Sequence, residues 1–165
     1  MKSIKAITSL LSGAALWCMA SLALAQVPQY GANVSYEQAR KAVAAAFAEV
    51  HKQNLPPMAV AVVDTAGQLV VFERMDNTQT ASTLVAQDKA MSAAMFRRST
   101  KVFQDAVAGG GVGLRILTLR GAIAVEGGLP LTIDGKIIGS IGVSGGSSEQ
   151  DGVAAKAGVE ALLAK

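Results

Sequence analysis

The 165-residue chain lacks the side chains from which small disulfide-rich and zinc-binding proteins are built. It contains one cysteine, one histidine and one tryptophan. Cys18 and Trp17 both lie in an apolar N-terminal segment, so a chain that begins after residue 25 has no disulfide, thiol nucleophile or cysteine-ligated zinc. A single histidine, His51, also excludes a zinc site of several histidines, whereas carboxylate sites for harder ions stay possible.

The N-terminal segment has the features of a secretory signal. Lys2 and Lys5 precede an apolar run over residues 7–24, and Ala23-Leu24-Ala25 forms an A-x-A cleavage site. We therefore predict a cleaved signal peptide over residues 1–25 and a periplasmic or secreted protein. Polar residues interrupt the run, which disfavours the alternative of a retained membrane anchor. Lipoprotein processing at Cys18 is disfavoured because the bulky Trp17 precedes it.

The charge balance gives no argument for a nucleic-acid partner, and none is predicted. The full chain has 15 basic and 12 acidic residues, and removal of Lys2 and Lys5 leaves 13 basic residues against the same 12. The basic character therefore comes largely from the export signal, and no basic patch for nucleic acid is predicted. The remaining chain of about 140 residues suits one domain with its own core.

Hydrophobic periodicity and turn residues predict an α+β domain after a flexible leader over residues 26–34. Ser35 and Gln38 form a capping box that starts a helix, and Asp134-Gly135 supplies the positive φ angles of a two-residue hairpin. The other predicted helices span 82–99, 100–108 and 149–163, and the strands span 58–63, 68–75, 122–125, 129–132 and 137–143. The run 114–119 is ambiguous. Helices packed on an antiparallel sheet account for this order.

Two glycine-rich segments, residues 127–151 and 109–113, each attract one functional interpretation, and both interpretations fail. Gly142-Val143-Ser144-Gly145-Gly146 matches the G-x-S-x-G nucleophile elbow, but no histidine follows Ser144 as a hydrolase would require. The separate loop 109–113 lacks the Gly-Lys-Ser/Thr ending of a phosphate-binding P-loop. The glycines inside the predicted strand still indicate close approach to the backbone by a ligand or a neighbouring element.

Several charged and polar residues have both a structural and a ligand-binding interpretation. Arg97, Arg98 and Lys101 cluster at a helix end, where they are either solvated or bind the carboxylates of a ligand. Lys89 is either an ordinary exposed lysine or a cation beside a cavity. Ser147 precedes the last helix as a cap, and the neighbouring glycine amides offer an alternative anion site.

The motifs occur together in an order that resembles a known family. They are Ala61-Val62-Val63-Asp64-x-x-Gly67, Arg74-Met75-Asp76, Lys89-Ala90, Gly127-Gly128-Leu129-Pro130-Leu131, Gly139-Ser140-Ile141-Gly142-Val143-Ser144-Gly145-Gly146 and Glu149-Gln150-Asp151. In this order they resemble the GlcG/HbpS-like family of haem-binding proteins, which includes the C-terminal domain of PduO-type proteins. The resemblance places a GlcG/HbpS-like domain at residues 35–165.

The resemblance implies a profilin-like three-layer fold with about five antiparallel strands between helices, a homo-oligomer and non-covalent haem binding. The residues it places near a cofactor or small anionic ligand are Lys89, Gly127, Gly128, Gly142, Ser144, Gly145 and Gly146. Because the iron ligand differs between branches of the family, His51, Thr100 and Tyr36 are candidates in that order.

Three functional hypotheses follow. The first is an exported protein that stores, transports or senses haem without turnover. The second is a small exported enzyme or accessory protein acting on an organic acid or related catabolite through Lys89, Asp64 or Asp134. The third is an interaction module whose oligomer docks a membrane sensor protein. Flexible methionines in a small apolar domain favour the first.

Overall fold

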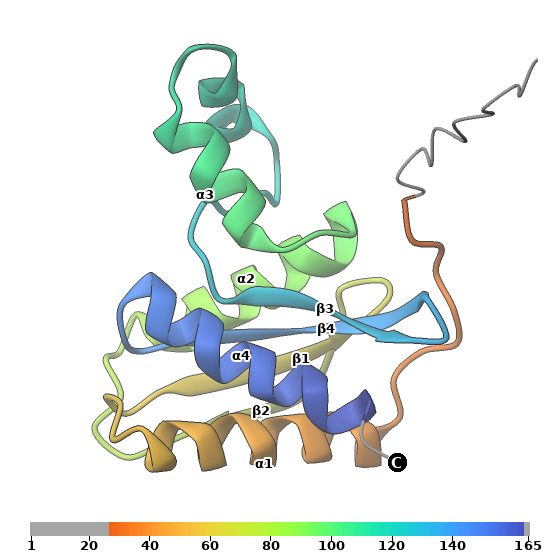
Figure 1. The fold of residues 1–165 in the computed structure, drawn as a ribbon, viewed down its shortest axis with the longest axis vertical. Helices are drawn as coiled ribbons and strands as arrows, with labels where there is room; N and C mark the ends of the chain where they lie inside the picture. The colour runs from red at the N-terminus through yellow and green to blue at the C-terminus, as the bar shows by residue number, and fades with distance from the viewer. Residues whose placement is uncertain (1–26, 164–165) are drawn as a thin grey trace, which may run out of the picture.

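The computed structural model describes residues 27–163, so the predicted signal peptide at 1–25 lies outside the described residues (Figure 1). The elements are α1 (Tyr36–Lys52), β1 (Ala59–Asp64), β2 (Leu69–Arg74), α2 (Ser82–Phe96), α3 (Thr100–Ala108), the 3₁₀ helix η1 (Gly111–Thr118), β3 (Gly128–Ile133), β4 (Lys136–Ser144) and α4 (Ser148–Leu163). The predicted α+β class is confirmed.

Local signals set several of these boundaries. The capping box is present at α1, where the Gln38 amide donates to the Ser35 side chain and the Ser35 amide donates to the Gln38 side chain. Ser147 caps α4 through the Gln150 amide. Asp134 and Gly135 turn the β3–β4 hairpin with φ of 49° and 73°. Helix α2 ends earlier than predicted because Arg97 adopts a left-handed conformation with φ of 54°.

The sheet has four antiparallel strands in the order β2-β1-β4-β3. The central pair is β1 and β4, in register from Ala59 opposite Ser144 to Asp64 opposite Gly139. Both central strands are buried almost throughout. The glycine-rich stretch thus includes a central strand of the sheet.

The prediction of about five strands is wrong for the described residues, because residues 122–125 form no strand. Side chains rather than a strand partner accept hydrogen bonds from this part of the backbone. The amide of Ile123 donates to Ser92 Oγ at 3.1 Å and the amide of Glu126 donates to Gln104 Oε1 at 2.8 Å. An apolar run that is tethered in this way has no ladder to join.

Helices cover both faces of the sheet and give three layers (Figure 1). On one face, α1 and α4 lie side by side, and their core includes Val60 and Val62 of β1. On the other face, α2 packs on β1 and β4, against Ala59, Ala61 and Val63. The alternation of side chains along β1 therefore divides one strand between two cores.

Residues 27–34, predicted to be a flexible leader, lie along the sheet. The amides of Gly31 and Val34 donate to the carbonyls of Ile137 and Ile138, both at 2.7 Å. Tyr30 extends this contact to α2, because its hydroxyl donates to the carbonyl of Ala94 at 2.8 Å and its ring faces the Arg97 guanidinium. The segment connects the start of β4 to the end of α2.

A second region extends from the three layers. We call residues 97–121, which contain α3 and η1, the lobe. In Figure 1 the lobe projects beyond the sheet at the top of the molecule, and η1 lies against α3. The apolar run that was ambiguous in sequence belongs to η1, whose one buried residue is Ile116.

Candidate functional site

A buried ion pair joins the two sequence motifs that surround the glycines. Lys89 of α2 donates to Asp151 of α4 at 2.7 Å and to the carbonyl of Val143 at 3.0 Å. The two side chains are 1% and 4% exposed. The other carboxylate oxygen of Asp151 accepts from the Gly146 amide at 2.9 Å. The pair therefore ties helices on opposite faces of the sheet to the end of β4.

Burial shifts both groups of this pair toward their neutral forms. Desolvation lowers the pKa of Lys89, and the hydrogen bond and charge of Asp151 oppose that change. Desolvation also raises the pKa of Asp151, and Lys89 and the Gly145 and Gly146 amides oppose it. In each group, the partner's hydrogen bond and charge oppose the effect of burial on the pKa. The two residues therefore depend on each other, since either one alone would be an unpaired buried charge.

The predicted ligand-binding glycines face the protein's own atoms. A Cβ atom added at Gly142 would overlap the backbone of α2 at Ala86 and Ala90, and one added at Gly128 would overlap the backbone of Lys89. A Cβ at Gly127 would lie 2.8 Å from Lys89 Nζ. The missing side chains allow α2 to approach β3 and β4 closely. This contact accounts for the strand glycines at which sequence alone indicated a close approach.

The remaining predicted glycines and serine surround the same ion pair. Gly145 and Gly146 follow β4, where added side chains would meet Met58. Ser144 ends β4, is 7% exposed and pairs with Ala59 of β1. The structure thus brings all seven predicted cofactor-binding residues to one end of the sheet, around a region that is packed with protein atoms.

The candidate iron ligands lie in three different places. Thr100 is fully buried, and its hydroxyl accepts the Gly128 amide at 2.9 Å. His51 is exposed in the last turn of α1, and Tyr36 is exposed in the first turn of the same helix. His51 and Tyr36 are open to an external ligand, whereas Thr100 is enclosed.

The acid–base residues of the enzyme hypothesis do not converge. Oδ1 of Asp64 accepts the amides of Ala66 and Gln68 at 2.8 and 2.9 Å and so stabilises the β1–β2 turn. Asp64 pairs with Gly139, whereas Lys89 contacts Val143 four residues along β4, a separation of roughly 13 Å at strand spacing. Asp134 is exposed in the hairpin turn beyond. These three residues share no site.

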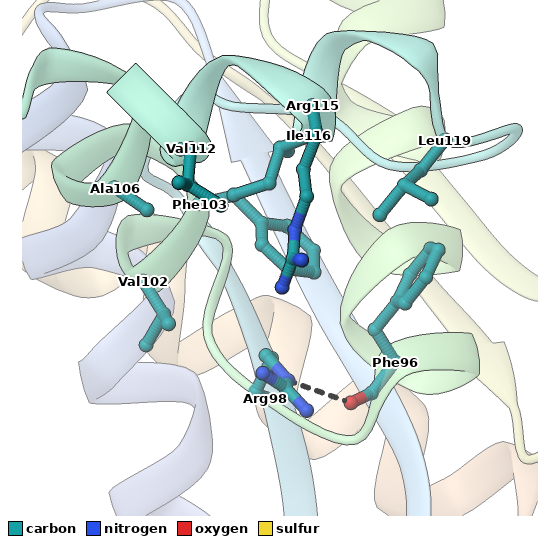
Figure 2. A pocket seen from close by; sticks show the side chains of 10 residues that line it. Phe96, Arg98, Val102, Phe103, Ala106, Val112, Arg115, Ile116 and Leu119 are labelled. Carbon is teal, nitrogen blue, oxygen red and sulfur yellow. Dashed lines mark hydrogen bonds between the residues drawn. The ribbon is translucent and has the colours of Figure 1, made fainter. Parts of the chain in front are cut away.

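An open cleft of about 360 Å³ lies between α3, η1 and the end of α2 (Figure 2). Eight of its ten lining residues are apolar and two are arginines. The lining residues are Phe96, Arg98, Val102, Phe103, Ala106, Val112, Gly113, Arg115, Ile116 and Leu119. A cleft of this size and composition is within the range of small-molecule sites.

Two aromatic rings form the floor of the cleft and hold one of its arginines. Phe96 and Phe103 meet edge to face with ring centroids 5.2 Å apart. The guanidinium of Arg98 lies 5.8 Å from the Phe103 ring centre, and its Nε donates to the carbonyl of Phe96 at 3.1 Å. Figure 2 shows Arg115 extending from η1 across Phe103 toward Arg98.

The cleft suits an apolar molecule that carries acidic groups. Arg98 and Arg115 are exposed and form no ion pair within residues 27–163, so their charges are available to an anion. Guanidinium groups bind carboxylates through paired hydrogen bonds. The lining contains no histidine, cysteine, methionine or tyrosine. The cleft therefore offers apolar side chains and two cationic groups, and it supplies no side chain of these types to a metal.

Sequence reasoning reached this cleft only in part. Arg98 belongs to the basic cluster for which binding of ligand carboxylates was considered. Arg115, Phe96, Phe103 and Ile116 were missed, because they come from three segments whose packing no local spacing reveals. One available signal was the charge of Arg115 inside the apolar run 114–119.

The described part of the chain lacks two further features. Within residues 27–163, no group of three or more histidine, cysteine, aspartate or glutamate side chains is placed to hold a metal ion. In the same range, no helix has the length and apolar character needed to cross a membrane.

Comparison with known proteins gives consistent relatives. Protein GlcG of Escherichia coli K12 is 37% identical over 108 residues, which cover 66% of this chain and 79% of GlcG. The crystal structure of the Klebsiella pneumoniae protein ORFY has a TM-score of 0.74 at 28% identity and covers 86% of this chain and 99% of that one. A crystal structure of a PduOC:heme complex has a TM-score of 0.69 at 30% identity and covers 78% of this chain and 94% of that one.

The match at the level of the family spans nearly the whole described region. The family model described as "Haem degrading protein HbpS-like" matches residues 34–160, from the end of the leader to the last turns of α4. The sequence motifs, the fold and these relatives agree, and the chain belongs to the HbpS-like family.

Proposed function

We propose that this chain is an exported haem-binding protein that stores, transports or senses haem without catalytic turnover. The observation that carries the proposal is the cleft, in which two unpaired arginines border walls of aliphatic and phenyl side chains. Membership of the HbpS-like family and similarity to the haem-bound PduOC structure support it.

The residues of the cleft match the two chemical halves of haem. The apolar macrocycle would lie against Phe103 and Ile116, where burial of its edge is favourable. The two propionates would bind Arg98 and Arg115. Bound haem supplies a redox-active iron, and this chain's contribution is to hold the ring and its acidic groups.

The iron ligand is a separate part of the proposal. His51 is the first candidate because it is exposed and its imidazole is a common iron ligand. It lies on α1, which contacts α4, β1 and β2, whereas the cleft is built by α2, α3 and η1. A haem bound by His51 and a haem bound in the cleft are therefore distinguishable by substitution. The homo-oligomer and the membrane sensor partner stay predictions that are independent of the choice of iron ligand.

Titration with hemin tests the proposal. The purified protein should shift the Soret band of hemin until a fixed stoichiometry is reached. The double change Arg98→Gln and Arg115→Gln should weaken hemin binding by about tenfold or more, equivalent to at least about 1.4 kcal/mol. The matched control is Lys136→Gln with Lys156→Gln, which removes two exposed charges outside the cleft and should leave binding unchanged.

The outcomes separate haem binding from its location. A spectrum that stays that of free hemin contradicts the function itself. Loss of the shifted band in His51→Ala, together with full affinity in the arginine variant, would retain the function and move the site from the cleft to α1. Unchanged spectra and affinity in His51→Ala would remove His51 as the ligand.

A further inference from the structure

The outer face of η1 carries leucines that line no part of the cleft. A 3₁₀ helix has three residues per turn, so Leu114 and Leu117 are stacked on one face. The residues that enter the cleft, Val112, Arg115 and Ile116, occupy the other two faces. The outer face therefore needs an explanation independent of the cleft.

These aliphatic side chains are unusually exposed for their size. Leu117 is 66% exposed and Leu114 is 49% exposed, and Val112 at the start of η1 is 74% exposed. They lie in the lobe, which Figure 1 shows projecting from the three layers. We call Leu114 and Leu117 the tip. Grouped exposed aliphatics of this kind mark an interaction surface.

The charge around the tip defines the partner. The lobe contains five basic residues and one acidic residue: Arg97, Arg98, Lys101, Arg115, Arg120 and Asp105. Asp105 forms an ion pair with Lys101 at 2.7 Å, so no unpaired carboxylate lies in the lobe. A net charge of +4 is concentrated in the lobe, whereas residues 26–165 as a whole carry 13 basic and 12 acidic residues.

We propose that the tip docks on the surface of an anionic lipid bilayer, with Leu114 and Leu117 inserted at the headgroup level and Arg120, which lies outside the cleft, bound to lipid phosphates. Apolar residues flanked by arginine and lysine are the composition of segments that lie in the membrane interface. Anionic lipids attract such basic segments over a Debye length. A second copy of the lobe is disfavoured as a symmetric partner because two surfaces of charge +4 would face each other.

The test is sedimentation of the purified protein, expressed as the full chain, with vesicles. Binding should be strong to vesicles of phosphatidylglycerol and phosphatidylcholine in equal parts, weak to phosphatidylcholine alone, and reduced by added salt. The double change Leu114→Ser and Leu117→Ser should lower the partition coefficient by about tenfold or more, since insertion of both side chains is lost. Arg120→Gln should lower it severalfold.

Leu84→Ser is the matched control, because Leu84 on α2 is 68% exposed and lies outside the lobe. It should sediment like the unchanged protein. Absence of binding to the anionic vesicles contradicts the proposal. So does equal loss of binding in the Leu84 variant. The competing explanation is that the tip mediates contacts between copies of this chain, and light scattering tests it. That explanation holds if the unchanged protein does not bind vesicles and the tip variant forms a smaller particle.

Discussion

The sheet domain and the lobe use apolar residues in opposite ways. In the sheet domain, β1 is buried on both faces and glycines let α2 approach β3 and β4 so closely that added methyl groups would overlap backbone atoms. In the lobe, η1 has eight residues, of which Ile116 is buried. Charge follows the same division, because Lys89 is buried and paired whereas Arg115 and Arg120 are exposed.

This difference indicates where binding to other molecules is available. The core of the sheet domain buries its apolar side chains and pairs its buried charge, so a change in that core should reduce stability. The lobe leaves aliphatic side chains and guanidinium groups unused, so a change there should affect binding and leave stability almost unchanged. The glycine-rich motif of this chain then has mainly a structural role, and the proposed ligand site is the cleft between α2, α3 and η1.

The strongest test of this division is Lys89→Met. The substitution leaves Asp151 buried without its ion-pair partner, and breaking a buried pair in this way costs about 3–5 kcal/mol. Urea denaturation followed by circular dichroism should show this loss in the free energy of unfolding. Hemin titration of the folded fraction should show an unchanged affinity, because Lys89 does not line the cleft.

The double variant Lys89→Met with Asp151→Asn provides the control. It removes both charges, and the asparagine carbonyl oxygen can still accept the Gly146 amide. Much of the lost stability should return, which would attribute the effect to the unpaired charge. If Lys89→Met alone stays within about 1 kcal/mol of the unchanged protein, the pair is not important for the fold.

The parts of the fold that sequence predicted are those determined by neighbouring residues. Ser35 and Gln38 are three residues apart, and Asp134 and Gly135 are adjacent, so the helix start and the hairpin could be predicted. The error at residues 122–125 has a different origin. The amide of Ile123 donates to Ser92, which is 31 residues away, instead of to a strand partner. The sequence around residues 122–125 does not reveal this distant contact.

The same distinction explains what was predicted of the site. The burial of Lys89 depends on Asp151, 62 residues away, so the isolated sequence favoured an ordinary exposed lysine. The strand glycines predicted a close approach to the strand backbone, and the element that approaches it is α2. The cleft requires three segments to converge, of which only the basic cluster containing Arg98 was identified as a possible ligand contact.

A smaller effect is expected at the contact between the leader and α2. Tyr30→Phe removes the hydroxyl that donates to the carbonyl of Ala94 at the end of α2. The side chain is partly exposed and water can replace the donor, so the loss should be about 0.5–1 kcal/mol in chemical denaturation. Tyr36→Phe, an exposed tyrosine on α1, should change stability less. Equal effects of the two substitutions would show that the Tyr30 hydroxyl has no specific role.

The smallest effect should come from the tip, and it compares the two regions directly. Leu117 of η1 is 66% exposed, whereas Leu131 of β3 is fully buried. Truncation of a buried leucine loses its burial and leaves a cavity, so Leu131→Ala should cost about 2–5 kcal/mol. Leu117→Ala loses little burial and should stay within about 0.5 kcal/mol of the unchanged protein in chemical denaturation. A loss at Leu117 approaching that at Leu131 would show that the leucine contributes to stability in solution, as it would if a second copy covered it. The tip would then belong to the assembly, and its exposure would no longer indicate a surface available to lipid.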